Sequence, residues 1–152
     1  MTYIMAEARQ ELLDTVAEAT DEIGVALTAL GDVYELLDDA SADTLEEQLF
    51  RPVQHAYGRA QRTHNEFATR YELPTRTFEA SAHQRPSVGI KGFIATAVDA
   101  VEQAEAILVE LQNSMSPVEV GDPEVRAGLA EVREILAQTT ARAEHFVSRF
   151  GR

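Results

Sequence analysis

Apolar residues recur three or four positions apart along four separate segments of this chain, and this spacing constrains the fold more than any other feature. Such spacing places apolar side chains on one face of an α-helix. No segment alternates apolar and polar residues as a half-buried β-strand would. The pattern therefore predicts an all-α protein, with helices over about residues 3–38, 44–72, 87–113 and 123–150.

Local signals mark where these helices begin and end. Thr44 opens a sequence typical of a capping box, and Ser87 and Asp122 are residue types that commonly cap helices. A proline directly after Asp122 strengthens that start. Pro74 is expected to end the second helix, whereas Pro52, inside it, is expected either to kink the helix or to lie in its first turn.

A chain of 152 residues has the length of one domain. Four helices that each carry one apolar face can bury those faces by packing together. We therefore expect a single domain over residues 1–152, folded as an up-down-up-down antiparallel four-helix bundle. The segment between the second and third helices, residues 73–86, is expected to be a long loop, since most connections between helices have roughly 2–8 residues.

The chain is acidic, with 26 Asp and Glu against 13 Lys and Arg and a net charge of −13. This charge repels phosphate backbones, so binding to nucleic acid is not expected. The absence of cysteine excludes disulfides, thiolate metal sites and cysteine nucleophiles. The sequence shows no secretory leader and no run of about 18 apolar residues, so we expect a cytoplasmic protein that does not contact a membrane.

Charge is distributed unevenly along the chain. Residues 1–50 hold 13 acids and one base, whereas residues 51–91 hold 3 acids and 7 bases. Helical geometry gathers most of these bases into a stripe on one side of the second helix. We expect this stripe to pair with acids of the first helix or of a second subunit. Its members are Arg51, His55, Arg59, Arg62 and Arg70.

The segment 73–92 combines basic residues with the start of a predicted helix. A helix N-terminus presents unpaired N–H groups and partial positive charge, and glycines allow an anion to approach the backbone closely. The competing interpretation makes Ser87 a helix cap and the two glycines points of close helix packing. The candidate anion-binding residues are Arg76, His83, Arg85, Ser87, Gly89, Lys91 and Gly92.

The carboxylates and histidines do not match the metal sites of known helical bundles. A di-iron bundle uses Glu-x-x-His pairs on two helices, and no histidine of this chain follows a glutamate at that spacing. The pairs Glu102/Glu105 and Glu131/Glu134 have the spacing of magnesium ligands in all-α nucleotide pyrophosphohydrolases, but helical geometry turns them away from a common centre. We therefore expect no catalytic residues, no metal and no cofactor.

His64 lies close to the apolar face of the second predicted helix, between Ala60 and Phe67. It could ligate a metal or haem, with His145 as the only conceivable partner, or it could be a partly buried histidine whose hydrogen bonds are satisfied. We favour the second interpretation, because no second core histidine or methionine is evidently placed opposite it.

Strong helical periodicity without a catalytic constellation favours a non-catalytic acidic bundle that works through protein–protein contact. The first helix carries a second apolar row beside its main one, and we expect this row to form a homodimer interface. Its candidate interface residues are Leu13, Leu27 and Tyr34. The alternative is a ligand-binding protein or small hydrolase that captures an anionic or phosphorylated molecule at residues 73–92.

Overall fold

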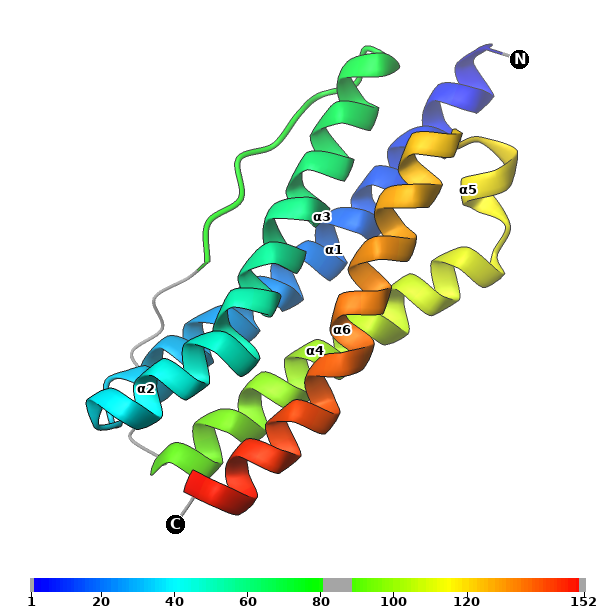
Figure 1. Ribbon diagram of the computed structural model, residues 1–152. Coiled ribbons are helices and arrows are strands. Elements are labelled where there is room, and N and C mark those ends of the chain that lie inside the picture. The colour runs from blue at the N-terminus through cyan, green and yellow to red at the C-terminus, as the bar shows by residue number, and fades with distance from the viewer. Residues whose placement is uncertain (1, 81–88, 151–152) are drawn as a thin grey trace.

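The protein is all-helical over the residues that the computed structural model describes, 2–80 and 89–150, and these ranges contain no strand. Long helices form the body of the molecule, and shorter helical elements lie at its two ends (Figure 1). Within the same ranges, no helix is both long and apolar enough to cross a lipid bilayer. The elements are α1 (Thr2–Tyr34), α2 (Asp39–Leu45), the π-helix η1 (Glu46–Phe50), α3 (Arg51–Arg70), α4 (Gly89–Asn113), α5 (Ser116–Glu119) and α6 (Pro123–Phe150).

The second helical segment begins earlier than expected because Asp38 caps it. The Asp38 carboxylate accepts a hydrogen bond from the N–H of Ser41 at 2.8 Å, and this bond holds the pKa of Asp38 below its ordinary value. Thr44 instead lies inside α2, where its hydroxyl donates to the carbonyl of Ala40 at 3.2 Å. The capping box predicted at Thr44 is therefore wrong, and the first helix ends at Tyr34 rather than near residue 38.

Pro52 takes one of the two positions expected for it, the first turn of a helix. The elements α2, η1 and α3 follow one another without a gap, and Pro52 lies in the first turn of α3. Proline has no N–H to donate to the preceding turn. The π-helical turn directly before it is therefore where the α-helical hydrogen-bond pattern changes.

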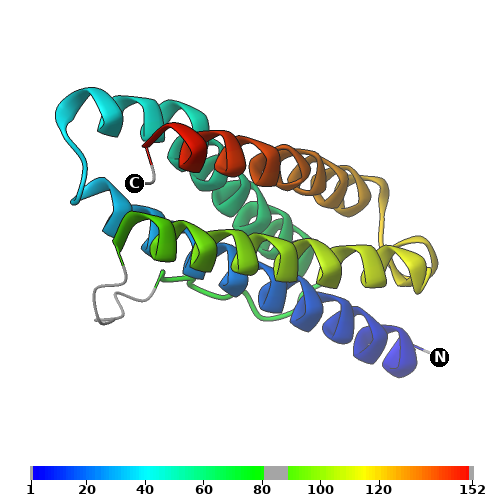
Figure 2. The same cartoon turned by 90° about the horizontal axis from the view of Figure 1, so that it is seen from below.

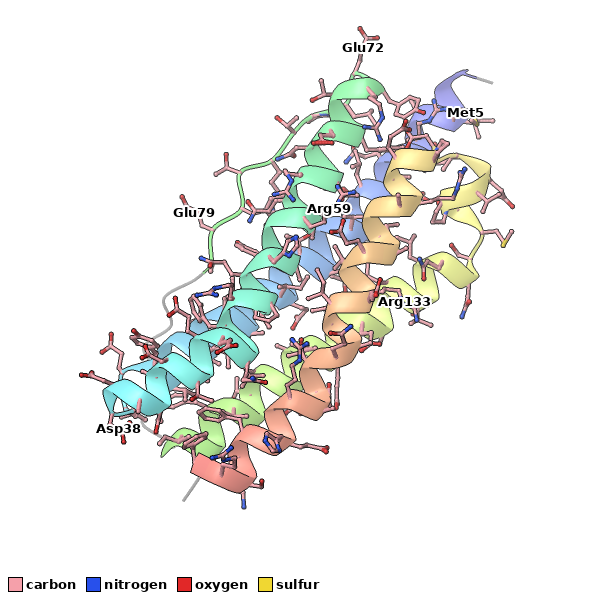
Figure 3. All side chains as sticks on the ribbon, in the orientation of Figure 1. Met5, Asp38, Arg59, Glu72, Glu79 and Arg133 are labelled. Atoms are coloured by element: carbon pink, nitrogen blue, oxygen red, sulfur yellow. The ribbon has the colours of Figure 1, made fainter. Side chains whose placement is uncertain are left out.

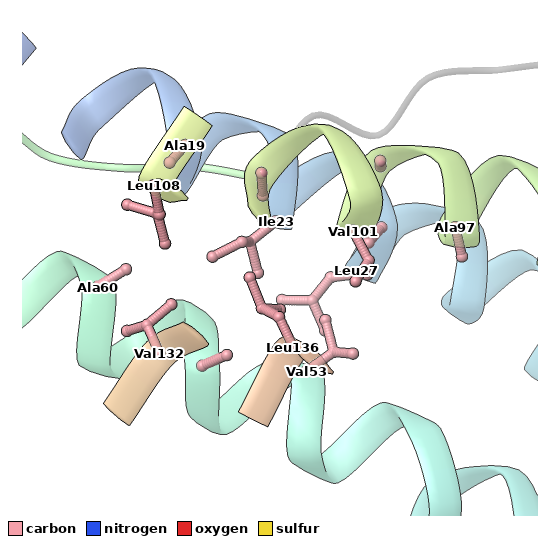
Figure 4. Close-up of a cluster of buried hydrophobic side chains, with 14 of the residues drawn as sticks. Ala19, Ile23, Leu27, Val53, Ala60, Ala97, Val101, Leu108, Val132 and Leu136 are labelled. Atoms are coloured by element: carbon pink, nitrogen blue, oxygen red, sulfur yellow. The ribbon is translucent and has the colours of Figure 1, made fainter. Parts of the chain in front are cut away.

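The long helices share one hydrophobic core. α1 packs against α3 and α4, and α6 packs against the same two helices. Figure 4 shows a part of this core, in which the labelled side chains are Ala19, Ile23, Leu27, Val53, Ala60, Ala97, Val101, Leu108, Val132 and Leu136. Truncation of a buried Leu or Ile to Ala typically costs about 2–5 kcal/mol of unfolding free energy, so the large side chains of this core contribute substantially to stability.

The helix directions differ from the up-down-up-down order expected from the sequence. In Figures 1 and 2, α1 and α6 run in one direction, whereas α3 and α4 run in the opposite direction. Each long helix is therefore antiparallel to the helices that it packs against, while α3 and α4, which follow each other in the chain, are parallel. Two consecutive parallel helices need a connection that returns along the bundle. This need accounts for the unusual length of the connection after α3.

The last helix begins where the sequence predicts, at Pro123. Asp122 caps it by accepting a hydrogen bond from the N–H of Val125 at 2.8 Å. The short helix α5, which precedes this cap, was not expected. The chain turns into α5 at Met115, whose φ of +67° lies in the left-handed region.

Candidate functional site

Three members of the basic stripe of α3, His55, Arg59 and Arg70, pair with carboxylates of α6 or of its cap, whereas Arg51 pairs with Glu46 of η1. Arg59, which lies between the two helices in Figure 3, donates from Nε to the carboxylate of Glu131 at 2.5 Å. Arg70 donates to both oxygens of Asp122, at 2.7 and 3.0 Å. Burial raises the pKa of Asp122, but the hydrogen bonds from Arg70 and from the Val125 N–H outweigh it and hold this pKa below its ordinary value. The expected pairing of the stripe with the first helix is wrong at these positions.

The contact between α3 and α6 is also sterically tight. A Cβ atom added at Gly128 of α6 would lie 2.2 Å from Oγ1 of Thr63, so a larger residue fits only if the Thr63 side chain or the helices shift. Glu131 lies one turn of α6 after Gly128. Besides its bond to Arg59, its carboxylate lies 3.7 Å from Nε2 of His55. Charge pairing and close packing therefore coincide on this side of the molecule.

α1 carries a row of acidic residues that the bases of α3 do not neutralise. The residues alternate spacings of four and three, which places them on one face of the helix, and all of them are exposed. Of the acids in this row, only Asp21 forms an ion pair with another described residue. Its partner, Arg76, lies outside the helices. We call this set the acidic row, and its members are Glu7, Glu11, Asp14, Glu18 and Asp21.

Residues 74–80, which we call the strap, run back along α3 on the side where α3 packs against α1 (Figures 1 and 2). Asn65 of α3 holds the strap backbone at Arg76. The Arg76 N–H donates to Oδ1 of Asn65 at 2.9 Å, and Nδ2 of Asn65 donates to the Arg76 carbonyl at 2.8 Å. The Nη2 atom of Arg76 lies 2.9 and 3.0 Å from the two carboxylate oxygens of Asp21, so the strap links α3 to α1.

Phe78 anchors the strap by its apolar side chain. Its ring is buried, and it meets the ring of His64 edge-on with the centroids 5.2 Å apart. The guanidinium carbon of Arg76 lies 4.6 Å from the centroid of the same ring. Farther along the strap, a Cβ added at Gly24 would lie 3.6 Å from Cα of Ala80, so the strap follows the surface of α1 closely.

The hydrogen bonds around Asn65 assign the tautomer of His64. Because Oδ1 of Asn65 accepts from the backbone of Arg76, this oxygen is the atom 2.8 Å from Nδ1 of His64. Nδ1 therefore carries the hydrogen and donates it, and Nε2 keeps its lone pair. Burial, which leaves His64 only 4% exposed, lowers its pKa, so the imidazole is neutral at neutral pH. In the described part of the chain, Nε2 has no hydrogen-bond partner.

His64 lines a pocket between α1 and the strap, with a volume of about 440 Å³. Its lining includes three carboxylates and the imidazole of His64, Gln10 donates to one of these carboxylates, that of Asp14, and its one cationic group, Arg76, is already paired with Asp21. Such a pocket favours positively charged hydrogen-bond donors. We call it the strap pocket, and its lining residues are Gln10, Asp14, Ala17, Glu18, Asp21, His64, Pro74, Thr75 and Arg76.

The structure does not gather the described candidates for anion binding. Arg76 faces Asp21 in the strap pocket, whereas Lys91 lines a separate groove between α4 and α6. Gly89 starts α4 with a φ of +74°, and Gly92 follows within the first turn. Outside the described residues lie His83, Arg85 and Ser87.

The candidate interface residues of the first helix have different positions from those expected. Leu13 is fully buried and Leu27 is 9% exposed, because α1 packs against both α3 and α4, which cover these two members of its second apolar row. These two residues are not available to a second subunit. Tyr34, at the end of α1, is 45% exposed.

Sequence reasoning treated His64 as a core residue and did not connect it with the strap. Two local signals could have suggested the connection. Asn65, a residue that readily hydrogen-bonds a backbone, directly follows the histidine, and Phe78 is the one large apolar residue in the strap. The pairing of these residues nevertheless depends on a return of the chain that no local pattern encodes.

The described residues contain no group of three or more histidine or carboxylate side chains that could hold a metal ion. Glu131, a member of one of the two carboxylate pairs considered above, is instead bonded to Arg59. No family model, no curated protein and no solved structure matches this chain.

Proposed function

We propose that this protein is a non-catalytic binding protein that contacts a positively charged partner through α1 and the strap. The observation that carries this proposal is the acidic row, whose carboxylates are exposed and, apart from Asp21, form no ion pair among the described residues. Two bases of α3 that could neutralise the row, Arg59 and Arg70, pair instead with Glu131 of α6 and with its cap Asp122. A basic surface on a partner would supply the compensating charge.

The acidic row carries an electrostatic cost that a basic partner relieves. Like charges four residues apart on a helix destabilise it by about 0.2–0.5 kcal/mol per pair. From Glu7 to Asp21 the row extends over about 21 Å, at 1.5 Å per residue. A negative surface of this length speeds association with positively charged proteins, and it does so most strongly at low ionic strength.

The rest of the fold supports this surface as a scaffold. We infer an antiparallel four-helix bundle with one crossover, in which the crossover is the segment that contains the strap. α1 is packed from its inner side by α3 and α4, so the acidic row is presented on a helix that is already fixed. A preorganised surface loses little conformational entropy when a partner binds.

A lysine-rich peptide tests the proposal, with its affinity measured by calorimetry at low and at physiological salt. Substitution of three row residues, Glu7→Gln, Glu11→Gln and Glu18→Gln, removes contacts worth about 0.5 kcal/mol each and is expected to weaken binding about tenfold. The matched control removes the same charge from exposed acids of α4 and α6, with the changes Glu102→Gln, Glu110→Gln and Glu134→Gln. Equal weakening by both variants would show that only net charge matters and would refute the proposal.

Self-association stays a prediction, although two of its expected contact residues are buried. Exposed large apolar residues do occur at both ends of the bundle. Tyr34 and Leu36 lie where α1 ends, and Ile4, Met115 and Val118 lie at the opposite end, where the start of α1 and α5 are close together in Figure 1. A homodimer would have to use one of these ends rather than the second apolar row of α1.

A further inference from the structure

The strap pocket has a chemistry that the charge of α1 alone does not explain. It joins three carboxylates of the acidic row with a histidine from a different helix, and of the three, Asp21 is paired with Arg76 whereas Asp14 and Glu18 form no ion pair among the described residues. The Nε2 atom of that histidine, His64, is a hydrogen-bond acceptor without a partner among the described residues. His64 is 4% exposed and lines this pocket, so its Nε2 atom offers an acceptor to a hydrogen-bond donor that enters there.

We propose that the strap pocket binds the guanidinium group of an arginine side chain of the partner. This inference rests on the proposed function and specifies what the partner inserts beside α1. The acceptors of the pocket lie on two walls, since Asp14 and Glu18 belong to α1 whereas His64 belongs to α3. A guanidinium presents five N–H donors in one plane, so it suits a pocket whose acceptors come from two different helices.

The chain already places one guanidinium at the edge of this pocket. Arg76 donates to both oxygens of Asp21 and stacks over Phe78 at 4.6 Å. A carboxylate and an aromatic ring therefore hold an arginine here within the protein itself. Because Asp21 neutralises Arg76, the charges of Asp14 and Glu18 remain uncompensated.

The same groups disfavour the other ligands considered for this segment. A phosphate or carboxylate would lie against Asp14 and Glu18 and would find few free donors, since the guanidinium of Arg76 is occupied. A lysine ammonium has the right charge, but its three donors radiate from a single nitrogen and span a smaller distance. The pocket chemistry therefore selects arginine over lysine and excludes anions.

The test compares three peptides that differ at one central residue, which is arginine, its neutral isostere citrulline, or lysine, within identical lysine flanks. Affinity is measured by calorimetry, and the imidazole nitrogens of His64 are followed by NMR. We expect the arginine peptide to bind about tenfold more tightly than the citrulline peptide. Only the arginine peptide is expected to shift the Nε2 resonance, because citrulline is neutral and the donors of a lysine ammonium span a smaller distance than those of a guanidinium.

Two single substitutions separate this inference from the proposed function. Asp14→Asn removes a pocket charge at an exposed position and is expected to abolish most of the preference for arginine over citrulline. Glu7→Gln, the matched control, lies in the acidic row but outside the pocket, and is expected to weaken all three peptides equally. Retention of the arginine preference in Asp14→Asn would overturn the assignment.

The remaining outcomes each decide between explanations. Peptide binding that depends on the acidic row but does not distinguish arginine from citrulline would overturn the inference and leave the proposed function standing. No binding of any peptide would overturn both. If methylguanidinium alone shifted His64 at the concentration where the arginine peptide does, the pocket would be a site for a free small cation. A response of His64 to inorganic phosphate, with none to arginine, would make the segment an anion site.

Discussion

The α3–α6 side and the α1–strap side of this molecule use charged residues in opposite ways. Between α3 and α6, Arg59 and Arg70 meet Glu131 and Asp122 across a tight helix contact, so charge helps to join the two helices. On α1, the acidic row faces outward, and only Asp21 has an ion-pair partner among the described residues. This difference shows that basic residues of a chain need not neutralise the charge of its most acidic helix. The side whose negative charge they leave without a partner is the side that is available to bind another molecule.

Of the substitutions that test this comparison, Gly128→Ala is expected to change the free energy of unfolding most. The added Cβ would lie 2.2 Å from Oγ1 of Thr63 and would force the Thr63 side chain or the two helices to shift. Overpacking of this kind typically costs up to about 3 kcal/mol, and we expect about 2–3 kcal/mol here in the free energy of unfolding by urea. Gly31→Ala is the control, since nothing lies within 4 Å of its Cβ position and the change should stabilise α1 by about 0.5–1 kcal/mol.

A second substitution shows whether the clash with Thr63 is the cause. Thr63→Ala removes Oγ1 and Cγ2, the two atoms nearest the added Cβ, and should recover most of the stability lost in Gly128→Ala. If Gly128→Ala alone left the urea midpoint unchanged, the contact between α3 and α6 would not be as close as described.

The next largest effect is a difference in unfolding free energy between two substitutions. Each removes a carboxylate that pairs with an arginine, and the two pairs lie on opposite sides of the molecule. Asp122 is 11% exposed at its side chain, bonds Arg70 twice and caps α6, so Asp122→Ala is expected to cost about 2 kcal/mol of unfolding free energy. Asp21 is 48% exposed, and its pair with Arg76 should be worth no more than about 0.5 kcal/mol. Urea denaturation of Asp122→Ala and Asp21→Ala measures both, and equal losses would contradict the distinction between the two sides.

The smallest expected effect is a pH dependence that comes from His64. Burial lowers its pKa in the folded protein, and Arg76 lowers it further, whereas Asn65, Asp14 and Asp21 oppose the shift. The unfolded chain therefore binds a proton below about pH 6.5 while the folded protein does not. The contribution of neutral His64 to the free energy of unfolding should be fully present above this pH. The free energy of unfolding should fall as the pH decreases from 6.5 toward the pKa of His64 in the folded protein.

Denaturation of wild type and His64→Gln at several pH values between 5 and 8 measures this contribution. The variant should lack the decline that the wild type shows below about pH 6.5. The carboxylates Asp122 and Glu131, whose pKa values are also lowered, lose their contribution only at more acidic pH and do not interfere. Identical pH profiles for the two proteins would show that His64 is not held neutral by its surroundings.

The parts of the fold that depend on local patterns could be predicted from the sequence. The spacing of apolar residues identified every long helix, and the combination of an acidic cap with proline placed the start of α6 at Pro123. Errors of a few residues arose where two capping signals competed, as at Asp38 and Thr44. Helical periodicity is a local property, so it survives in the folded structure.

The parts that depend on long-range contacts could not be predicted. Periodicity does not state whether consecutive helices run parallel or antiparallel, so the return of the chain along α3 was missed. The strap pocket depends on that return, because it brings Arg76 beside Asp21 and Phe78 beside His64. Periodicity indicates two apolar rows on α1, but only the structure shows that Leu13 and Leu27 of the second row are covered within one chain while Tyr34 stays exposed.

The central claim is that partners bind on the α1–strap side, and chemical-shift mapping with the arginine peptide tests it most directly. Backbone amide resonances of the labelled protein are followed during the titration. We expect the shifted residues to lie on the exposed face of α1 between residues 7 and 21 and in the strap, residues 74–80, together with His64. Shifts confined to the α3–α6 side or to the groove between α4 and α6 would contradict the claim.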